Sequence, residues 1–188
     1  MYKRQLLARA YTDDPLLVWL FPDPAHRQEC AAAWLGLFVE QYLAGLGPVD
    51  VIGGDPLTAL AAWRLPGAVP PSPALLPTLP GLLAALVGTE RAAELGAALA
   101  ALGALRPATP HAYLHLLAVD PDAQGRGHGR AVLQTGLARL AGTGLPAHLE
   151  TTNPSALPFY ASCGFTVGRS LRLAAGGPVV YSLARAPR

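Results

Sequence analysis

The residues best suited to chemistry form a glycine-rich segment, Gln124 to Gly129 (QGRGHG), with Arg130 directly after it. An apolar run, Tyr113 to Val119, precedes the segment, and residues 130–140 carry leucines at the spacing of one helical face. A tight loop between a strand and a helix leaves the first N–H groups of the helix without internal partners, so they can bind an anion. Glycines let the backbone approach a phosphate closely, and Arg126 and Arg130 add positive charge. The segment therefore predicts a phosphate-binding loop.

The spacing of the glycines narrows the choice of ligand. It does not match the G-x-G-x-x-G pattern of dinucleotide-binding loops, and no Gly-Lys-Ser/Thr follows as in a P-loop. The pattern Gln124-x-x-Gly127-x-Gly129 resembles the pyrophosphate loop of the GNAT superfamily of N-acetyltransferases, Q/R-x-x-G-x-G/A, which holds coenzyme A.

A second segment strengthens this resemblance. Residues 153–160 (NPSALPFY), followed by Cys163-Gly164-Phe165, are similar to the N-x-x-A-x-x-F-Y-x-x-x-G-F segment of the superfamily. The resemblance covers residues 111–173. Within the superfamily the layout is most similar to that of the puromycin N-acetyltransferases, whereas the histidine at position 115 resembles the arylalkylamine N-acetyltransferases.

The resemblance implies a site for acetyl-CoA. The backbone of Leu117 and Val119 would bond the pantetheine arm, and the Leu117 N–H would polarise the thioester carbonyl. The residues implied to bind acetyl-CoA are Leu117, Ala118, Val119, Gln124, Gly125, Arg126, Gly127, His128, Gly129, Arg130 and Asn153.

Three residues are candidates for proton transfer. Tyr160 matches the tyrosine that protonates the departing sulfur in the superfamily, although a tyrosine there can also be a core residue. His115 is the first candidate for the base, acting through a water, because the alternation of a strand would put it on the face used by Leu117 unless a bulge intervenes. Its alternative is a histidine satisfied by hydrogen bonds near the core. Glu150 is the second candidate, with a solvent-facing residue at a sheet edge as its alternative.

These features predict an N-acetyltransferase that transfers an acetyl group from acetyl-CoA to a primary amine of a small molecule, by direct attack in a ternary complex. Asp13 and Asp14 would attract a cationic amine, or form a solvated helix end. The aromatic residues that would line an acceptor pocket, or form the core beneath it, are Trp19, Phe21, Trp34, Phe38 and Trp63. The alternative functions are a non-catalytic sensor that binds acyl-CoA, and an acetyltransferase of protein N-termini or lysines.

The elements that position these residues indicate a mixed α/β (α+β) fold. We expect one domain over 1–188, with acceptor-side helices and a hairpin in 1–110, the acetyl-CoA core in 111–173 and a closing strand in 174–188. The resemblance to the GNAT superfamily implies a mostly antiparallel sheet, flanked by helices and splayed between its two central strands. Helices are expected at 3–12, 24–46, 81–104, 130–140 and 155–163, a proline-rich loop at 65–80, and strands at 49–52, 57–64, 113–119, 146–152, 165–173 and 179–183.

The first strand of the superfamily is missing from this pattern, because the chain opens directly into the helix predicted at 3–12. We therefore expect a truncated start and an unpaired edge on the hairpin at 49–64.

The composition of the chain argues against several classes of protein. The chain has 188 residues, 52% of them hydrophobic and 14% charged, with a net charge of +2 and no basic cluster, which argues against a nucleic-acid partner. Prolines interrupt the long uncharged stretch at 65–89, so no membrane helix is expected there, and we expect a cytoplasmic protein. Cys30 and Cys163 lie far apart and the five histidines have no ligand spacing, so neither a disulfide framework nor a metal site is expected.

Overall fold

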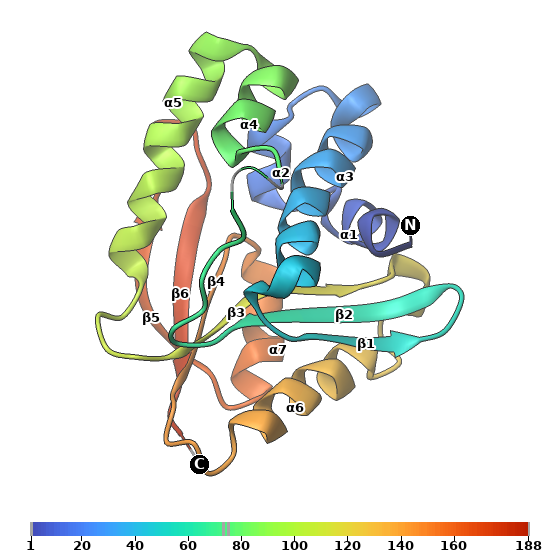
Figure 1. The fold of residues 1–188 in the computed structure, drawn as a ribbon, viewed down its shortest axis with the longest axis vertical. Coiled ribbons are helices and arrows are strands. Elements are labelled where there is room, and N and C mark those ends of the chain that lie inside the picture. The colour runs from blue at the N-terminus through green and yellow to red at the C-terminus, as the bar shows by residue number, and fades with distance from the viewer. Residues whose placement is uncertain (1, 73, 75, 188) are drawn as a thin grey trace.

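The strands of this computed structural model, which describes residues 2–72, 74 and 76–187, form one sheet of six in the order β1-β2-β3-β4-β6-β5 (Figure 1). All neighbours are antiparallel except β3 and β4, which run parallel. The mixed, mostly antiparallel sheet that the sequence predicts is thereby confirmed. The strands are β1 (Val49–Gly53), β2 (Leu57–Arg64), β3 (Ala112–Val119), β4 (Ala147–Thr151), β5 (Thr166–Arg172) and β6 (Val179–Arg185).

Helices cover both faces of the sheet. Helices α1 to α3 lie on one side of strands β1 to β3, and α6 lies on the other (Figure 1). The α-helices are α1 (Tyr2–Tyr11), α2 (Pro15–Leu20), α3 (Pro24–Gln41), α4 (Leu79–Val87), α5 (Thr89–Ala100), α6 (His128–Leu140) and α7 (Leu157–Ser162). Short 3-10 turns span Ala101–Leu105, Pro121–Ala123 and Pro154–Ala156, and a π-helical turn spans Tyr42–Leu46.

Local residues explain where helices depart from the predicted ranges. The sequence assigned no element to the run after Asp14, but Asp14 caps α2 by accepting a hydrogen bond from Leu16 N–H, and Pro15 suits its first turn. The helix predicted through Leu46 leaves α geometry after Gln41, because Gly45 has a φ of 105°. The helix predicted at 155–163 is a 3-10 turn followed by the six-residue α7.

The sheet opens between β3 and β4, as the sequence predicts. These strands pair only through Ala112 with Ala147 and Tyr113 with His148, at the start of both strands. Beyond this point the two strands diverge. The gap exposes the backbone of the second half of β3 to whatever lies between the strands.

A bulge in β3 overturns one expectation. Ala62 pairs with Leu116 and Trp63 with Leu114, so His115 has no partner on β2. The extra residue reverses the alternation of side chains. His115 lies on the α3 side of the sheet, against Phe38, whereas Leu117 packs into the cluster on the opposite side. The prediction that His115 shares a face with Leu117 is therefore wrong.

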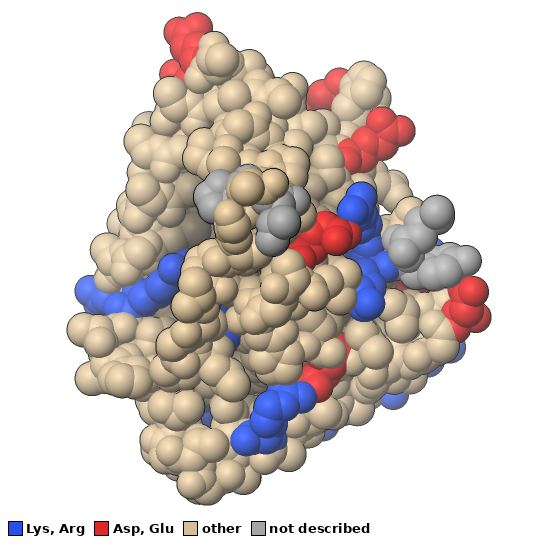
Figure 2. All heavy atoms as spheres, in the orientation of Figure 1, with Lys and Arg blue, Asp and Glu red and all other residues tan. Residues whose placement is uncertain are grey.

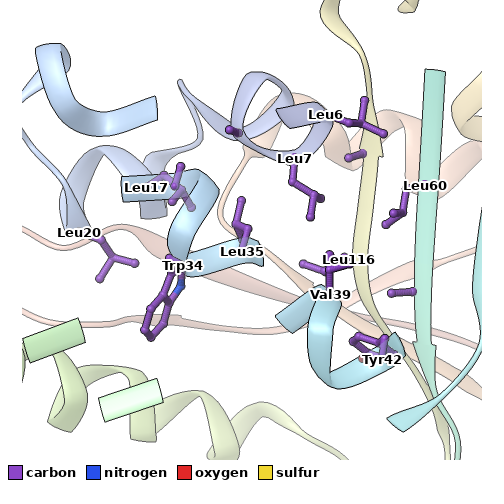
Figure 3. Close-up of a cluster of buried hydrophobic side chains, with 14 of the residues drawn as sticks. Leu6, Leu7, Leu17, Leu20, Trp34, Leu35, Val39, Tyr42, Leu60 and Leu116 are labelled. Atoms are coloured by element: carbon purple, nitrogen blue, oxygen red, sulfur yellow. The ribbon is translucent and has the colours of Figure 1, made fainter. Parts of the chain in front are cut away.

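Two buried clusters hold the sheet between its helices. On the α1–α3 side, leucines of three helices pack onto Leu60 and Leu116 of the sheet (Figure 3). On the α6 side, the predicted stripe of Leu133, Leu137 and Leu140 is buried with Trp63. A Cβ at Gly136 would lie 2.1 Å from Trp63 Nε1, so this helical position requires glycine for close packing.

The face of the molecule drawn in Figure 2 carries charges of both signs. Figure 2 shows Lys and Arg side chains in separate small groups, with acidic side chains between them. Among the described residues, no helix is long and apolar enough to cross a membrane, and no group of three His, Cys, Asp or Glu could hold a metal. Residues 73 and 75 of the predicted proline-rich loop lie outside the described residues. Among the strands of the described residues, β1 pairs only with β2.

Candidate active site

The glycine-rich loop connects the end of β3 to α6. Gly125 and Gly127 have φ values of 75° and 85°, a conformation that favours glycine. Gln124 Nε2 lies 3.5 Å from the Val119 carbonyl oxygen, which ties the loop to the strand end. The sequence from strand to loop to helix is therefore formed as predicted.

The N-terminus of α6 is suited to an anion. Gly127 is the N-cap residue, and no side chain caps the first turn. A Cβ at Gly125 or Gly127 would meet no atom within 4 Å, so the space above the loop is open. Uncapped N–H groups and the helix dipole both favour negative charge here. The residues present therefore fit the diphosphate of coenzyme A.

A cavity of about 650 Å³ extends from this loop toward the gap between β3 and β4. The predicted site residues that line it are Leu117, Ala118, Val119, Gln124, Gly125, Gly127, His128, Gly129, Arg130, Asn153 and Tyr160. The cavity is completed by Arg9, Ala10, Tyr11, Asp13, Asp14, Pro121, Ala123, Thr151, Ala156 and Phe159. The end of α1 with the turn after it, the glycine-rich loop and α7 thus line the same cavity.

Several predicted residues lie elsewhere. Arg126 is exposed, and His115 and Glu150 are on the sheet; none of the three lines the cavity. None of the predicted pocket aromatics lines it either. Phe21 and Trp34 are buried in the α1–α3 cluster, Trp19 and Phe38 pack against that cluster, and Trp63 is buried on the other face of the sheet.

Tyr11 is a site residue that the sequence reasoning missed. Its hydroxyl donates to the Leu117 carbonyl oxygen at 2.9 Å and accepts from the Leu117 N–H at 3.3 Å. The Asp120 N–H bonds the Thr58 carbonyl oxygen on β2, and backbone directions alternate along a strand, so the Leu117 groups face the gap. The Tyr11 hydroxyl is therefore bonded to the backbone N–H of Leu117, the group that the family resemblance predicts to polarise the thioester carbonyl. No spacing connects residue 11 with residue 117.

Tyr160 lies on α7 with its ring against Phe159 and Phe165, at centroid distances of 5.2 and 5.9 Å. It is buried yet lines the cavity. Burial raises the pKa of its hydroxyl, and the negative charge of Asp14 raises it further. The hydroxyl therefore keeps its proton at neutral pH and can donate it.

His115 is held on the other side of the sheet. Its Nδ1 lies 3.0 Å from the Tyr42 hydroxyl, and its ring stacks on Tyr113 at 5.3 Å. Burial, with the positive charges of Arg64 and Arg106, lowers the pKa of His115 to about 3. The imidazole is therefore neutral at pH 7 and a weak base.

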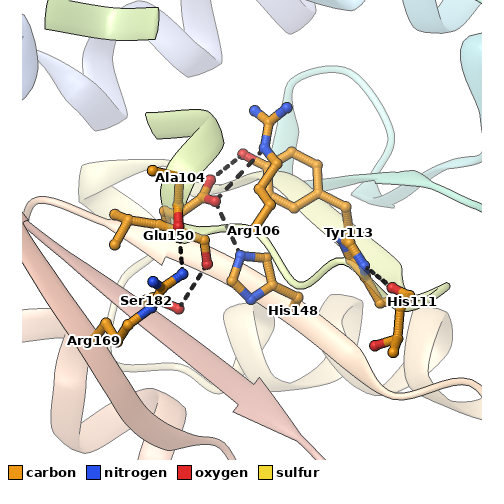
Figure 4. A network of polar contacts seen from close by, with 10 residues as sticks. Ala104, Arg106, His111, Tyr113, His148, Glu150, Arg169 and Ser182 are labelled. Carbon is orange, nitrogen blue, oxygen red and sulfur yellow. Dashed lines mark hydrogen bonds and ion pairs between the residues drawn. The ribbon is translucent and has the colours of Figure 1, made fainter. Parts of the chain in front are cut away.

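Glu150 belongs to a polar network beneath the turn at Ala101–Leu105 (Figure 4). Tyr113 donates to its carboxylate at 2.6 Å, His148 Nε2 lies 3.0 Å away, and Arg106 Nε lies 3.7 Å away. Burial opposes ionisation of Glu150, but these partners outweigh it and lower the pKa of the carboxyl. The carboxylate is saturated with donors, which weakens it as a base.

Comparison with known proteins agrees with this geometry. The model of the Acetyltransferase (GNAT) family matches residues 80–165, a span that contains the loop, α6, β4 and α7. This part of the chain, just under half of its length, is therefore similar to the GNAT family. Mycothiol acetyltransferases from Nocardioides and Geodermatophilus obscurus are 41% and 43% identical to it over 56 residues. That region is 28% of this chain, and the chain spans about a fifth of those proteins, 19% and 18% of their lengths.

Solved structures share the GNAT fold over nearly the whole chain. One from Corynebacterium glutamicum, described as histone acetyltransferase HPA2 and related acetyltransferase, has a TM-score of 0.70 at 24% identity, covering 98% of this chain and 89% of that one. The arylalkylamine N-acetyltransferase 2 of Aedes aegypti has a TM-score of 0.60 at 10% identity, covering 100% and 94%. At these identities the likeness concerns the fold alone.

Proposed function

We propose that this protein is an N-acetyltransferase that transfers an acetyl group from acetyl-CoA to a primary amine of a small molecule, by direct attack in a ternary complex. The observation that carries the proposal is the continuous cavity that joins the uncapped N-terminus of α6 to Tyr160 and the gap beside Leu117. An anion site at one end and a proton donor at the other are what thioester aminolysis needs.

In this proposal, different groups of the chain bind the cofactor and transfer the proton. The first-turn N–H groups of α6 hold the diphosphate, and Val119 offers backbone groups to the pantetheine arm. Acetyl-CoA, when bound, supplies the acetyl group as an activated thioester. Tyr160 holds a proton at its hydroxyl for the sulfur, whose bond to carbon breaks as the bond from the amine nitrogen forms. Because His115 and Glu150 are both committed to partners away from the cavity, their proposed role as bases has less support than that of Tyr160 as acid.

The test is to compare Tyr160→Phe with the wild type. Phenylalanine keeps the ring packing and removes only the hydroxyl. We expect kcat for thiol release from acetyl-CoA with an amine panel to fall about 10- to 100-fold, since general acids contribute on that order or more. Acetyl-CoA affinity by titration calorimetry should change by no more than about twofold, because the diphosphate site is untouched.

Tyr181→Phe is the matched control, since Tyr181 packs against the same buried cluster but does not line the cavity. It should leave both quantities unchanged. Acetyl-CoA binding without thiol release from any amine would instead support the non-catalytic sensor. Absence of acetyl-CoA binding to a folded protein would refute the proposal.

A further inference from the structure

Asp14 brings a carboxylate to the wall of the cavity. It lies at the turn between α1 and α2 and lines the hollow together with Tyr11 and Tyr160. Its hydrogen bonds from the Leu16 N–H at 2.9 Å and from the Thr152 hydroxyl at 2.7 Å both end on Oδ1. The Oδ2 atom accepts neither of them.

In the part of the chain that the structure describes, no cationic side chain neutralises this carboxylate. Within the described residues 2–72, 74 and 76–187, no Lys, Arg or His forms an ion pair with Asp14. The nearby Arg9 is paired with Asp120 and Asp122, at 3.3 and 2.6 Å. Burial accordingly raises the pKa of Asp14, and only neutral donors offset this effect. A partly buried carboxylate without a counter-ion is costly, so a ligand that supplies positive charge is favoured.

We propose that Asp14 binds the protonated amino group of the acceptor, in a subsite that it forms with the hydroxyl groups of Tyr11 and Tyr160. This inference rests on the proposed function and deepens it, because it assigns the acceptor to the class of primary alkylammonium compounds. An ammonium group has three N–H donors and needs acceptors around it. One carboxylate and two tyrosine oxygens on one wall supply them. A neutral or anionic acceptor would leave the charge of Asp14 uncompensated.

The same subsite gives the amine a route to its reactive form. The ammonium group must lose one proton before its nitrogen can attack, and Asp14 is the carboxylate that accepts it. Nitrogen then forms the bond to the acetyl carbon while the carbon–sulfur bond breaks, and the thiolate takes its proton from Tyr160. The acylated nitrogen gives its second proton to the Tyr160 oxygen, which restores the hydroxyl group and leaves a neutral amide. Asp14 passes its proton to solvent when the product leaves.

The experiment measures discrimination between matched ligands. Primary amines and the alcohols of the same skeleton, tyramine with tyrosol and phenethylamine with phenylethanol, are titrated into the protein alone at pH 7. We expect the wild type to bind at least one amine about tenfold more tightly than its alcohol, the size of a charge-assisted hydrogen bond of about 1.4 kcal/mol. Asp14→Asn should reduce this preference to about twofold or less, because asparagine keeps the Oδ1 acceptor and the cap but not the charge.

Asp23→Asn is the matched control. Asp23 also precedes a proline and caps a helix, α3, by accepting from the Ala25 N–H at 2.9 Å, but it is exposed and outside the cavity. It should keep the full preference for amines. A wild type that binds no amine more tightly than its alcohol, or an Asp14→Asn protein that keeps the preference, overturns the inference.

Acetyl-CoA binding separates this inference from the proposed function. All three proteins should bind acetyl-CoA alike, since the diphosphate end is unchanged. A wild type that binds acetyl-CoA but shows no preference for amines counts against the Asp14 subsite alone, and a folded wild type that does not bind acetyl-CoA counts against the proposed function. The wild-type comparison of amine with alcohol remains decisive even if Asp14→Asn does not fold.

Discussion

The hydroxyl group of Tyr11 engages both backbone groups of Leu117 that face the gap between β3 and β4. An acyl carbonyl that needs the Leu117 N–H must compete with this contact. Burial raises the pKa of Tyr11, so its hydroxyl stays protonated and keeps donating to the Leu117 carbonyl oxygen at neutral pH. Tyr11 therefore occupies the backbone N–H and carbonyl groups of Leu117, at the open edge of β3, when no ligand is bound.

Tyr11→Phe should free the Leu117 N–H. A buried hydrogen bond contributes about 0.5–1.5 kcal/mol, so we expect acetyl-CoA to bind about 2- to 10-fold more tightly, and the free energy of unfolding to fall by about 1 kcal/mol. Titration calorimetry and urea unfolding measure the two effects. Tyr42→Phe loses a hydroxyl bonded to His115 outside the cavity. It should show the loss of stability without the gain in affinity, and weaker binding by Tyr11→Phe would mean that Tyr11 supports the ligand instead.

At the scale of elements, the junction from β3 to α6 combines a strand edge, a loop and a helix terminus. The strand provides the backbone groups of Leu117 and Val119, and the helix provides N–H groups with no capping side chain. Gly127 joins the two with a φ of 85° and lines the cavity together with His128. The anion site therefore depends on backbone conformation more than on side chains.

Gly127→Ala should disturb this junction. A residue with a Cβ is strained at this φ by about 1–2 kcal/mol, and relaxation of the loop would misdirect its N–H groups. We expect acetyl-CoA affinity to fall at least about tenfold, the equivalent of 1.4 kcal/mol. Gly67→Ala is the control, because Gly67 has a φ of 81°, equally open surroundings and a position outside the cavity. An equal loss of affinity in both variants would trace the effect to general destabilisation.

At the scale of the whole molecule, one sheet separates two environments. The glycine-rich loop, which is the proposed acetyl-CoA end, leads into α6 on one side, and the network of Tyr113, His115 and Glu150 lies on the side of α3. The packing of α3 onto β3 partly buries His115 among nearby positive charges. This burial links the stability of the entire fold to pH.

The lowered pKa of His115 predicts how the free energy of unfolding changes with pH. Its folded-state pKa of about 3 lies below the ordinary 6.5, so the unfolded state binds the proton first as the pH falls. Stability is therefore lost as the pH falls from 6.5 toward 3, by about 2 kcal/mol between pH 7 and pH 5 from this group. His115→Gln should lose less stability over that interval in urea unfolding. His26→Gln removes an exposed imidazole whose pKa is raised by Asp23, and it should not reduce the loss.

The sequence by itself determined the features that depend on neighbours along the chain. The Gln124–Gly129 loop, the leucine stripe of α6 and the strand pattern are local, since each is specified by residue types at short spacing. They were enough to indicate the fold class and a resemblance to the GNAT superfamily, and that resemblance implied the splayed sheet. The segment at 153–160 was found in the same way, although its helix is shorter than predicted.

Only the tertiary structure decided which side chains meet in the cavity. The bulge at His115 follows from pairing β3 with β2, and it moved this histidine to the far face of the sheet. Tyr11 lies 106 residues from Leu117, and Asp14 lies 138 residues from Thr152, so no local spacing connects them. Their contacts arise because α1 and the start of α2 pack across the open gap of the sheet. Packing between distant segments, unlike helical periodicity, leaves no repeating pattern in one sequence.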